Sequence, residues 1–258
     1  MSSIILEIKD SIAFITMNRP EKFNAFNREM ALSLQGILKR VHNDDTVRCV
    51  YLTGSGKAFC AGQDLSEVID PNGPGMDKIL IEHFNPITLA IRNLNKPVLC
   101  VVNGVAAGAG ANFALAGDIV IAKESAIFIQ AFSKIGLVPD SGGTFLLPRL
   151  IGFQKASALM MLGEKVTAKD AEQYGMIYKS FPDESFETEA LKLAKVLAAM
   201  PTKALALTKK ALNLSLSNSL EEQLKIEDSM QQQAAATQDF KEGVKSFIEK
   251  RPPVFKGI

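Results

Sequence analysis

The chain alternates between short apolar runs and amphipathic stretches over most of its length. Apolar runs rich in β-branched residues predict strands at 3–9, 12–18, 48–53, 98–103, 118–122 and 126–129, with a further short extended piece at 175–178. Apolar positions three and four residues apart predict helices at 28–42, 64–68, 77–93, 111–116, 142–150, 154–162, 167–174, 185–199, 201–215 and 219–249. Asn27 precedes the first of these helices as a candidate N-cap.

The order of these elements predicts the fold class. Strands and helices alternate through the first two thirds of the chain, and almost everything after residue 154 is helical. This order is typical of an α/β core followed by a helical appendage. We expect a core over residues 1–199 and a C-terminal helical region over residues 200–258, with a surface loop at 70–76.

Composition removes several function classes. The 258 residues carry a net charge of +1, with 47% hydrophobic and 22% charged residues, which is typical of a soluble globular protein. The near-neutral charge and the absence of a Lys/Arg-rich run argue against binding to nucleic acid. Only two histidines are present, so a three-histidine metal site is excluded and no metal is expected. Acid–base chemistry is therefore expected from carboxylates and backbone groups.

The two histidines and the three cysteines are expected to be structural. His42 ends a basic helix and is predicted to lie on the surface, and His83 is predicted to be a structural residue. Cys49 and Cys100 lie in apolar runs, and Cys60 has no nearby histidine that would activate it as a nucleophile. Unpaired thiols without a C-x-x-C motif favour a reducing compartment, and we expect a cytoplasmic protein.

One segment raises the question of a membrane span. Residues 97–122 contain a single charge, Asp118. They also contain Asn103 and Asn112, and no basic cluster or aromatic belt flanks them. A buried strand followed by a buried helix explains this composition better, so no contact with a membrane is expected.

Three glycine-rich segments, at 57–65, 104–110 and 136–144, each lead into a predicted helix, and the first two follow an extended run. Such turns either pack a helix tightly on a sheet or bring backbone N–H groups close to a ligand. Asp64 is expected to cap a helix. Asp140 either caps the next helix, as Ser141 also can, or presents its carboxylate to an apolar cleft. Lys209 and Lys210 are expected on a solvated helix face.

Taken together, the segments resemble the enoyl-CoA hydratase/isomerase (crotonase) superfamily. The matching landmarks follow one another along almost the whole chain: MNRPEKFNAF at 17–26, KAFCAGQDL at 57–65, VNGVAAGAGANFA at 102–114, GDI at 117–119, GLVPDSGGT at 136–144 and FIEKR at 247–251. The resemblance implies a crotonase-like spiral of β-β-α turns with a C-terminal helical trimerisation region. It implies homotrimers or dimers of trimers, and an acyl-CoA substrate that brings its own coenzyme A, with no other cofactor.

The resemblance also implies roles for individual residues. The backbone N–H groups of Gln63 and Ala109 correspond to the oxyanion hole that holds the thioester oxygen. Gly110, Asn112 and Phe132 correspond to the acyl pocket. The positions implied in coenzyme A binding are Lys22, Ala61, Gln63, Asp64 and Leu65, together with Phe247 and Lys250 from a neighbouring subunit.

Two departures from the family pattern concern the chemistry. Hydratases of the family use two glutamates, and Asn112 and Phe132 stand at those positions here. Asp140 stands where dienoyl-CoA isomerases and aryl-CoA dehalogenases of the family carry a functional aspartate. The motifs are closest to isomerases of bacterial phenylacetate degradation, which convert a ring epoxide to an oxepin and also shift an enoyl double bond. We therefore expect an acyl-CoA isomerase with Asp140 as its single base.

Three alternatives stay open at this point. The first is an enoyl-CoA hydratase of fatty-acid or aromatic-acid degradation that relies on Asp140 alone. The second is an aryl-CoA dehalogenase in which Asp140 is a nucleophile. The third is a non-catalytic member of the family that binds RNA, against which the charge pattern argues.

Overall fold

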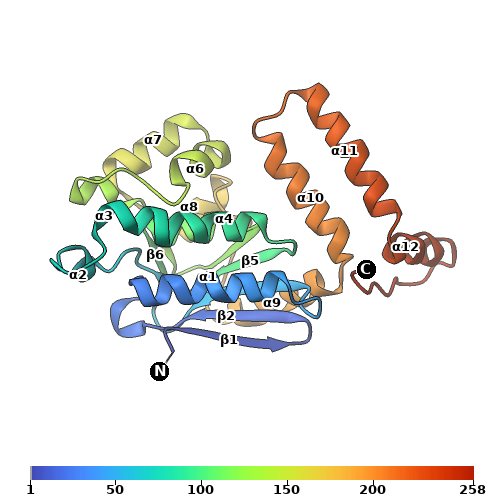
Figure 1. Cartoon of the computed structure of the whole chain (residues 1–258), viewed down its shortest axis with the longest axis horizontal. Coiled ribbons are helices and arrows are strands. Elements are labelled where there is room, and N and C mark those ends of the chain that lie inside the picture. The colour runs from blue at the N-terminus through green and yellow to red at the C-terminus, as the bar shows by residue number, and fades with distance from the viewer. Residues whose placement is uncertain (1) are drawn as a thin grey trace.

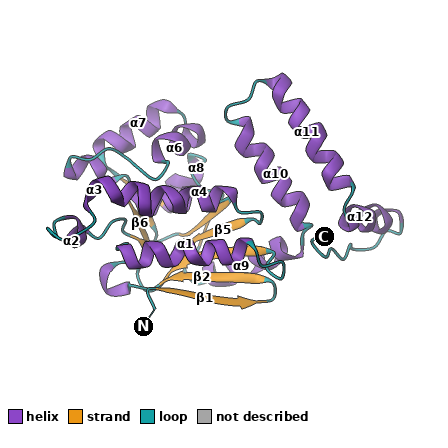
Figure 2. Cartoon of the chain, in the orientation of Figure 1, coloured by secondary structure: helices purple, strands orange, loops and turns teal. Residues whose placement is uncertain are grey.

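Two β-sheets form the centre of the protein (Figures 1 and 2). The computed structural model describes residues 2–258. The large sheet has the strand order β1-β2-β3-β5-β7-β10, with β1 antiparallel to β2 and the other pairs parallel. Its strands are β1 (Ile4–Lys9), β2 (Ile12–Met17), β3 (Cys49–Gly54), β5 (Val98–Val102), β7 (Ile119–Lys123) and β10 (Lys179–Phe181).

The small sheet has the order β4-β6-β8-β9, and only its last pair is antiparallel. Its four strands have three residues each: β4 (Ala58–Cys60), β6 (Val105–Ala107), β8 (Ile127–Ile129) and β9 (Lys165–Thr167). The sequence pattern did not predict β4, β6 or β9, because three residues are too few to show a period of two. The extended piece expected at 175–178 was wrong, since the strand lies at 179–181.

The chain winds through the two sheets in repeated turns. Three consecutive strand pairs, β3/β4, β5/β6 and β7/β8, each place the first strand in the large sheet and the second in the small sheet. A helical segment follows each pair before the next strand of the large sheet begins. This spiral of β-β-α turns confirms the fold class predicted above. It also places the segments that follow β4, β6 and β8 close to one another.

The helices cover both faces of the large sheet. Their bounds are α1 (Arg28–His42), α2 (Leu65–Val68), α3 (Gly75–Lys78), the π-helical segment η2 (Ile79–Phe84), α4 (Asn85–Asn93), α5 (Ala109–Leu115), α6 (Gly143–Ile151), α7 (Phe153–Leu162), α8 (Ala168–Gln173) and α9 (Phe186–Ala199), with short 3₁₀ turns η1 (Pro20–Lys22) and η3 (Ala131–Ile135). Asn27 caps α1 as predicted, because its side chain accepts a hydrogen bond from Met30 N at 3.0 Å.

Alternation along the strands divides the core in two. In β5, Val98, Cys100 and Val102 belong to the main hydrophobic core, together with the apolar face of α1. Leu99 and Val101 face the other way and belong to a second cluster with α9. Both faces of β5 are therefore buried, which explains the continuous apolar run in the sequence.

The apolar segment 97–122 is thus part of the core. It contains β5, β6, α5 and the beginning of β7. Within residues 2–258, no helix combines the length and the apolar character needed to cross a bilayer.

All three cysteines are buried and unpaired. Burial raises the pKa of each thiol to about 12. The prediction that Cys49 and Cys100 are core residues is confirmed, and Cys60 is unsuited to nucleophilic chemistry at neutral pH.

The C-terminal helices α10 (Thr202–Ser215), α11 (Leu220–Ala235) and α12 (Gln238–Ile248) extend away from the sheets (Figure 1). The sequence pattern predicted one helix over 219–249. The structure divides it, because Thr237 ends the first part and caps the second by accepting from Phe240 N at 3.0 Å.

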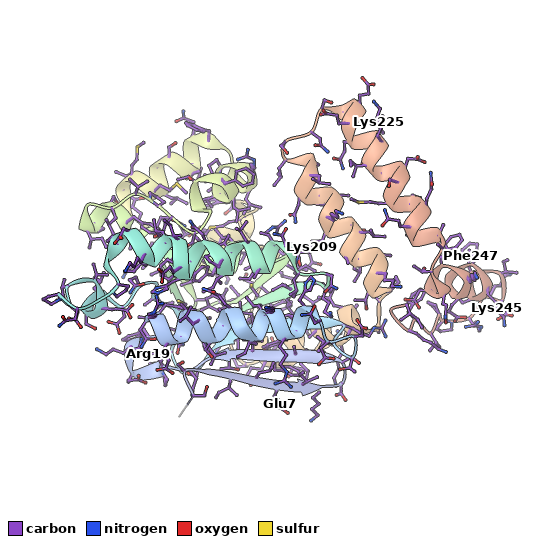
Figure 3. The ribbon with its side chains drawn as sticks, viewed as in Figure 1. Glu7, Arg19, Lys209, Lys225, Lys245 and Phe247 are labelled. Carbon is purple, nitrogen blue, oxygen red and sulfur yellow. The ribbon has the colours of Figure 1, made fainter. Side chains whose placement is uncertain are left out.

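The prediction of a solvated Lys209 was wrong. Its side chain is 5% exposed, and its ammonium group lies 2.8 Å from Asp118 Oδ2 and donates to the Ile91 carbonyl at 2.7 Å. Figure 3 shows Lys209 on the side of α10 that faces α4. The residue ties the C-terminal helices to the core.

Candidate active site

The first turn of the site runs from β4 to α2. Gly62 has φ +91°, a conformation that favours glycine. Two hydrogen bonds join this turn to the segment that precedes α1. Phe26 N donates to Gly62 O at 2.7 Å, and Asp64 N donates to Phe26 O at 2.8 Å. Within residues 2–258 the backbone N–H of Gln63 has no acceptor. It is a free donor at the start of a helical turn.

Asp64 holds this turn in place. Its carboxylate accepts from Ser66 N at 3.1 Å and from Arg19 Nη2 at 2.9 Å. Burial opposes ionisation, but the hydrogen bonds from Ser66 and Arg19 outweigh it and lower the pKa of Asp64. The predicted capping role is confirmed, and the side chain is fully occupied within the protein.

The second turn runs from β6 to α5. Gly108 has φ +54° and donates its N–H to the Ile129 carbonyl at 2.9 Å. Ala109 is the first residue of α5, so its N–H has no partner in the helix, and no other acceptor is found in the described chain. It is a second free donor.

Glycines bring the two turns together. A Cβ atom built on Gly62 would lie 3.1 Å from Ala107 O and 3.3 Å from Ala109 N. A Cβ atom on Gly110 would overlap the Cys60 carbonyl. The tight-packing interpretation of these glycines is therefore correct, and the same close packing places the free N–H groups of Gln63 and Ala109 on adjacent turns.

The third turn connects η3 to α6 and carries Asp140. Ser141 and Gly142 both have positive φ, +52° and +81°, and α6 begins directly after them. Gly142 occupies the N-cap position, and neither Asp140 nor Ser141 caps the helix with its side chain. The capping alternative is thus wrong. The backbone carbonyl of Asp140 accepts from Gly143 N and from Asn112 Nδ2, each at 2.8 Å.

The carboxylate of Asp140 is half-buried and has one hydrogen-bond partner, the Ser141 hydroxyl at 2.8 Å. Burial raises the pKa of Asp140 to about 6, and the Ser141 hydroxyl only partly offsets this shift. No charged side chain contributes to the shift. A carboxyl group with this pKa can both accept and return a proton near neutral pH.

Asn112 links the second and third turns. It lies three residues after Ala109 on α5, which is about 4.5 Å along the helix axis. The Asp140 turn is therefore fixed close to the helix end that presents the free N–H of Ala109. Phe132 lines the same region, since its ring lies 3.7 Å from the position of a Cβ atom on Gly108. Neither Asn112 nor Phe132 is titratable.

Gln130 was missed by the sequence reasoning. Its side chain is 3% exposed and donates to Asn112 Oδ1 at 2.8 Å. Its Oε1 is one of three buried side-chain atoms in the described chain that lack a partner. The only sequence signal was a lone glutamine at the end of an apolar strand.

The remaining predicted residues are spread over the surface. Lys22 is exposed on η1, Ala61 is half-buried, and Leu65 is 50% exposed at the start of α2. Phe247 is 85% exposed on α12, and Lys250 follows that helix. Figure 3 places Phe247 at the opposite end of the molecule from Arg19, the partner of Asp64. Within one chain, Phe247 is therefore far from the turn that carries Asp64.

The histidines do not join the site turns. His42 is exposed, as predicted. His83 is buried, with Nε2 3.1 Å from Arg28 Nη1, and burial lowers its pKa. Among residues 2–258, no cluster of three or more His, Cys, Asp or Glu is suited to hold a metal ion.

The family model described as enoyl-CoA hydratase/isomerase matches residues 7–258. The chain belongs to the enoyl-CoA hydratase/isomerase family. It is 47% identical over 260 residues to the 1,2-epoxyphenylacetyl-CoA isomerase of Escherichia coli K12, covering 100% of this chain and 99% of the relative. It is 45% identical to a probable enoyl-CoA hydratase of Rhodobacter capsulatus, covering 99% and 98% of the two chains.

A solved structure leads to the same family. The enoyl-CoA hydratase of Bacillus anthracis matches with a TM-score of 0.92 at 31% identity, covering 99% of this chain and 100% of that one. The resemblance inferred from the motifs is confirmed, including the likeness to a ring-epoxide isomerase. The chain is an enzyme of the hydratase/isomerase type.

Proposed function

We propose that the protein is an acyl-CoA isomerase that uses Asp140 as its single base. The thioester oxygen of the substrate accepts hydrogen bonds from the N–H groups of Gln63 and Ala109. Asp140 removes a proton from the acyl chain, and the electrons of the broken C–H bond move to the thioester oxygen as an enolate. The protonated Asp140 then returns the same proton to a different carbon, so no atom is gained or lost.

The observation that carries this proposal is the state of Asp140. Of the side chains joined at the three turns, Gln130, Asn112, Phe132 and Asp140, only Asp140 can exchange a proton near neutral pH. Two free N–H donors on adjacent turns supply the electrostatic assistance that an enolate requires. The substrate class is a coenzyme A thioester whose acyl group undergoes a double-bond shift or the expansion of a ring epoxide to an oxepin. In the expansion the C–C bond shared by the ring and the epoxide breaks, and its electrons enter the double bonds of the seven-membered ring. The 47% identical relative has such an isomerase name.

The proposal extends to the assembly. Lys22, Ala61 and Leu65 contact the coenzyme A portion, and Phe247 and Lys250 contribute from a neighbouring copy. Phe247 lies far from the Arg19 end of its own chain, and Lys250 follows the same helix. Residues 200–258 then form the oligomerisation region of a homotrimer or a dimer of trimers in the cytoplasm. The reaction needs no cofactor besides the coenzyme A of the substrate.

The direct test is Asp140→Asn assayed with trans-3-hexenoyl-CoA and with the epoxide of phenylacetyl-CoA. We expect kcat to fall about 10²–10⁴-fold, because a positioned general base is lost, while binding of a saturated acyl-CoA stays within about twofold. Asp10→Asn, in the exposed turn between β1 and β2, is the matched control and should keep full activity. Full activity of Asp140→Asn would exclude the proposed base.

Hydration is the second candidate function, because the 45% identical relative is named as a hydratase. Incubation with crotonyl-CoA separates the two. Formation of 3-hydroxybutyryl-CoA faster than the double-bond shift of trans-3-hexenoyl-CoA would favour the hydratase. Isomerisation with little hydration supports the single-base mechanism.

A further inference from the structure

A chain of two buried amides ends on the Asp140 turn. Gln130 Nε2 donates to Asn112 Oδ1 at 2.8 Å, and Asn112 Nδ2 donates to the Asp140 carbonyl at 2.8 Å. Asn112 is 0% exposed and Gln130 is 3% exposed. The two side chains connect the end of β8 to α5 and α5 to the turn before α6.

The direction of this chain is determined at its Asp140 end. A backbone carbonyl only accepts hydrogen bonds, so Asn112 must turn its Nδ2 toward Asp140 and its Oδ1 toward Gln130. Gln130 must then present Nε2, which leaves its Oε1 buried without a partner. The orientation of both amides therefore follows from the position of Asp140.

Gln130 is an unfavourable residue for its buried location. A buried acceptor without a partner destabilises the folded protein. An apolar side chain of similar volume would remove Gln130 Oε1, but it would leave Asn112 Oδ1 without its donor. The amide has one hydrogen bond in the structure, the one to Asn112. Its presence is explained by what it does to Asn112.

The Asp140 turn needs an external tie. Ser141 and Gly142 both have positive φ, which is unfavourable for serine. Gly143 packs so closely on Asn112 that an added Cβ atom would overlap the amide. The Thr88 hydroxyl also donates to Ser141 O, at 3.3 Å. The contact with Asn112 is the one that reaches Asp140 itself from another element.

We propose that Asn112 and Gln130 are positioning residues that act in series to hold the Asp140 carboxylate in its working position. This inference rests on the proposed function of Asp140 as the base. It also explains why an amide, not a carboxylate, occupies position 112: an ionised Glu or Asp there would face the Asp140 carbonyl with two acceptors opposed.

The first test is Gln130→Leu, compared with Gln35→Leu. Gln35 likewise donates from a half-buried amide to backbone carbonyls, those of Glu82 at 2.7 Å and His83 at 3.1 Å, but it joins α1 to η2. With trans-3-hexenoyl-CoA we expect kcat of Gln130→Leu to fall about 10–100-fold, because small displacements of a reacting group are costly. KM should change less than about twofold, and Gln35→Leu should match the wild type.

Two further readouts separate positioning from a merely structural role. The apparent pKa in the profile of kcat/KM against pH should move down from about 6, because a loosened Asp140 gains solvent. The melting temperature should change little, because the variant removes the orphaned Gln130 Oε1 but leaves the buried Asn112 Oδ1 without its donor. A wild-type kcat and pH profile would overturn the proposal, as would a loss of activity that merely follows a lowered melting temperature. If the leucine variant fails to fold, Gln130→Met, with a similar volume, gives the same readouts.

A double-mutant cycle tests the series arrangement. If Gln130 acts only through Asn112, the double variant Asn112→Ala/Gln130→Leu should be no slower than Asn112→Ala alone. A double variant that is slower than Asn112→Ala by the full factor of Gln130→Leu would overturn the series arrangement. The outcome is separable from the proposed function: full activity in Asp140→Asn removes the base itself, whereas an inactive Asp140→Asn with unaffected Gln130 variants removes only the positioning role.

Discussion

Two aspartates, Asp118 and Asp140, show opposite ways of placing a carboxylate in this protein. Asp118 lies between α5 and β7, with Lys209 at 2.8 Å, Arg92 at 3.7 Å and the Val98 N–H at 2.8 Å. Asp140 has only the Ser141 hydroxyl. Both are half-buried, so burial alone does not distinguish them.

The difference lies in compensation of the charge. Around Asp118 two cations and a backbone N–H satisfy the carboxylate, and the group joins α10 and α4 to the sheet. Around Asp140 no cation offsets the burial, and its pKa rises to about 6. A compensated carboxylate holds elements together, while an uncompensated one retains the capacity to take up a proton. The backbone follows the same division, since Val98 N–H is bonded and those of Gln63 and Ala109 are free.

Besides the loss of Asp140, the largest effect on turnover is expected from filling the space next to the free N–H of Ala109. Gly62→Ala would place a methyl group 3.3 Å from Ala109 N, where the thioester oxygen is proposed to bind. We expect kcat to fall about 10²–10³-fold, as for loss of one oxyanion-hole donor. Gly175→Ala is the control, because it has a similar φ of +76° but its nearest contact is an ordinary 3.6 Å. Equal effects of both variants would reduce the result to backbone strain.

Removing the charge of Asp118 should lower the stability of the folded protein. Asp118→Asn leaves Lys209 and Arg92 without their counter-charge, and we expect the free energy of unfolding to fall by about 2–4 kcal/mol. Urea denaturation measures the change. The exposed pair Lys225–Glu221 on α11 is the matched comparison, and Lys225→Ala should cost less than about 0.5 kcal/mol. An Asp118→Asn variant with the same free energy of unfolding as the wild type would contradict the structural role of Asp118.

Removing the charge of Asp140 should have the opposite effect and raise the stability of the folded protein. The folded-state pKa of Asp140, about 6, lies above its usual value of 3.8, so the folded protein binds the proton more tightly than the unfolded chain. The contribution of Asp140 to stability therefore decreases as the pH rises from about 4 to about 6. We expect Asp140→Asn to be more stable than the wild type by about 1–2 kcal/mol at pH 8, a gain that is absent at pH 4. Unfolding curves at the two pH values check this, and a destabilised Asp140→Asn at pH 8 would refute it.

The smallest effect belongs to an exposed charge. Lys22 is exposed on η1, and its proposed contact with coenzyme A is screened by solvent. Lys22→Ala should raise KM for acyl-CoA about two- to fivefold at low salt, with kcat unchanged. Lys225→Ala should leave KM unaltered. A KM that does not depend on salt in either protein would argue against the contact.

The sequence allowed the fold to be predicted further than the site. Long elements such as β5, α1 and α9 follow from apolar periodicity, and Asn27 and Asp64 cap as their residue types suggest. The family motifs led to Gln63, Ala109 and Asp140. Lys209 was misassigned because helical periodicity shows that α10 is amphipathic but not which neighbour covers the side with the lysine.

Gln130 was missed for a related reason. Its importance depends on a contact with Asn112, 18 residues earlier, and on the direction of that hydrogen bond. Neither follows from spacing along the chain. The positive φ of Ser141, which decides against the helix-cap interpretation of Asp140, is likewise fixed by tertiary contacts.

None of the three buried thiols is expected to react quickly with alkylating reagents, because thiols with a pKa of about 12 are almost wholly protonated at pH 7. A single surface cysteine, for example Phe247→Cys on α12, would then be the one fast-reacting site for a maleimide dye. Spectroscopic labels can be attached there without first replacing a native cysteine. The fluorescence of such a label would report directly on whether acyl-CoA or another subunit covers the outer helix.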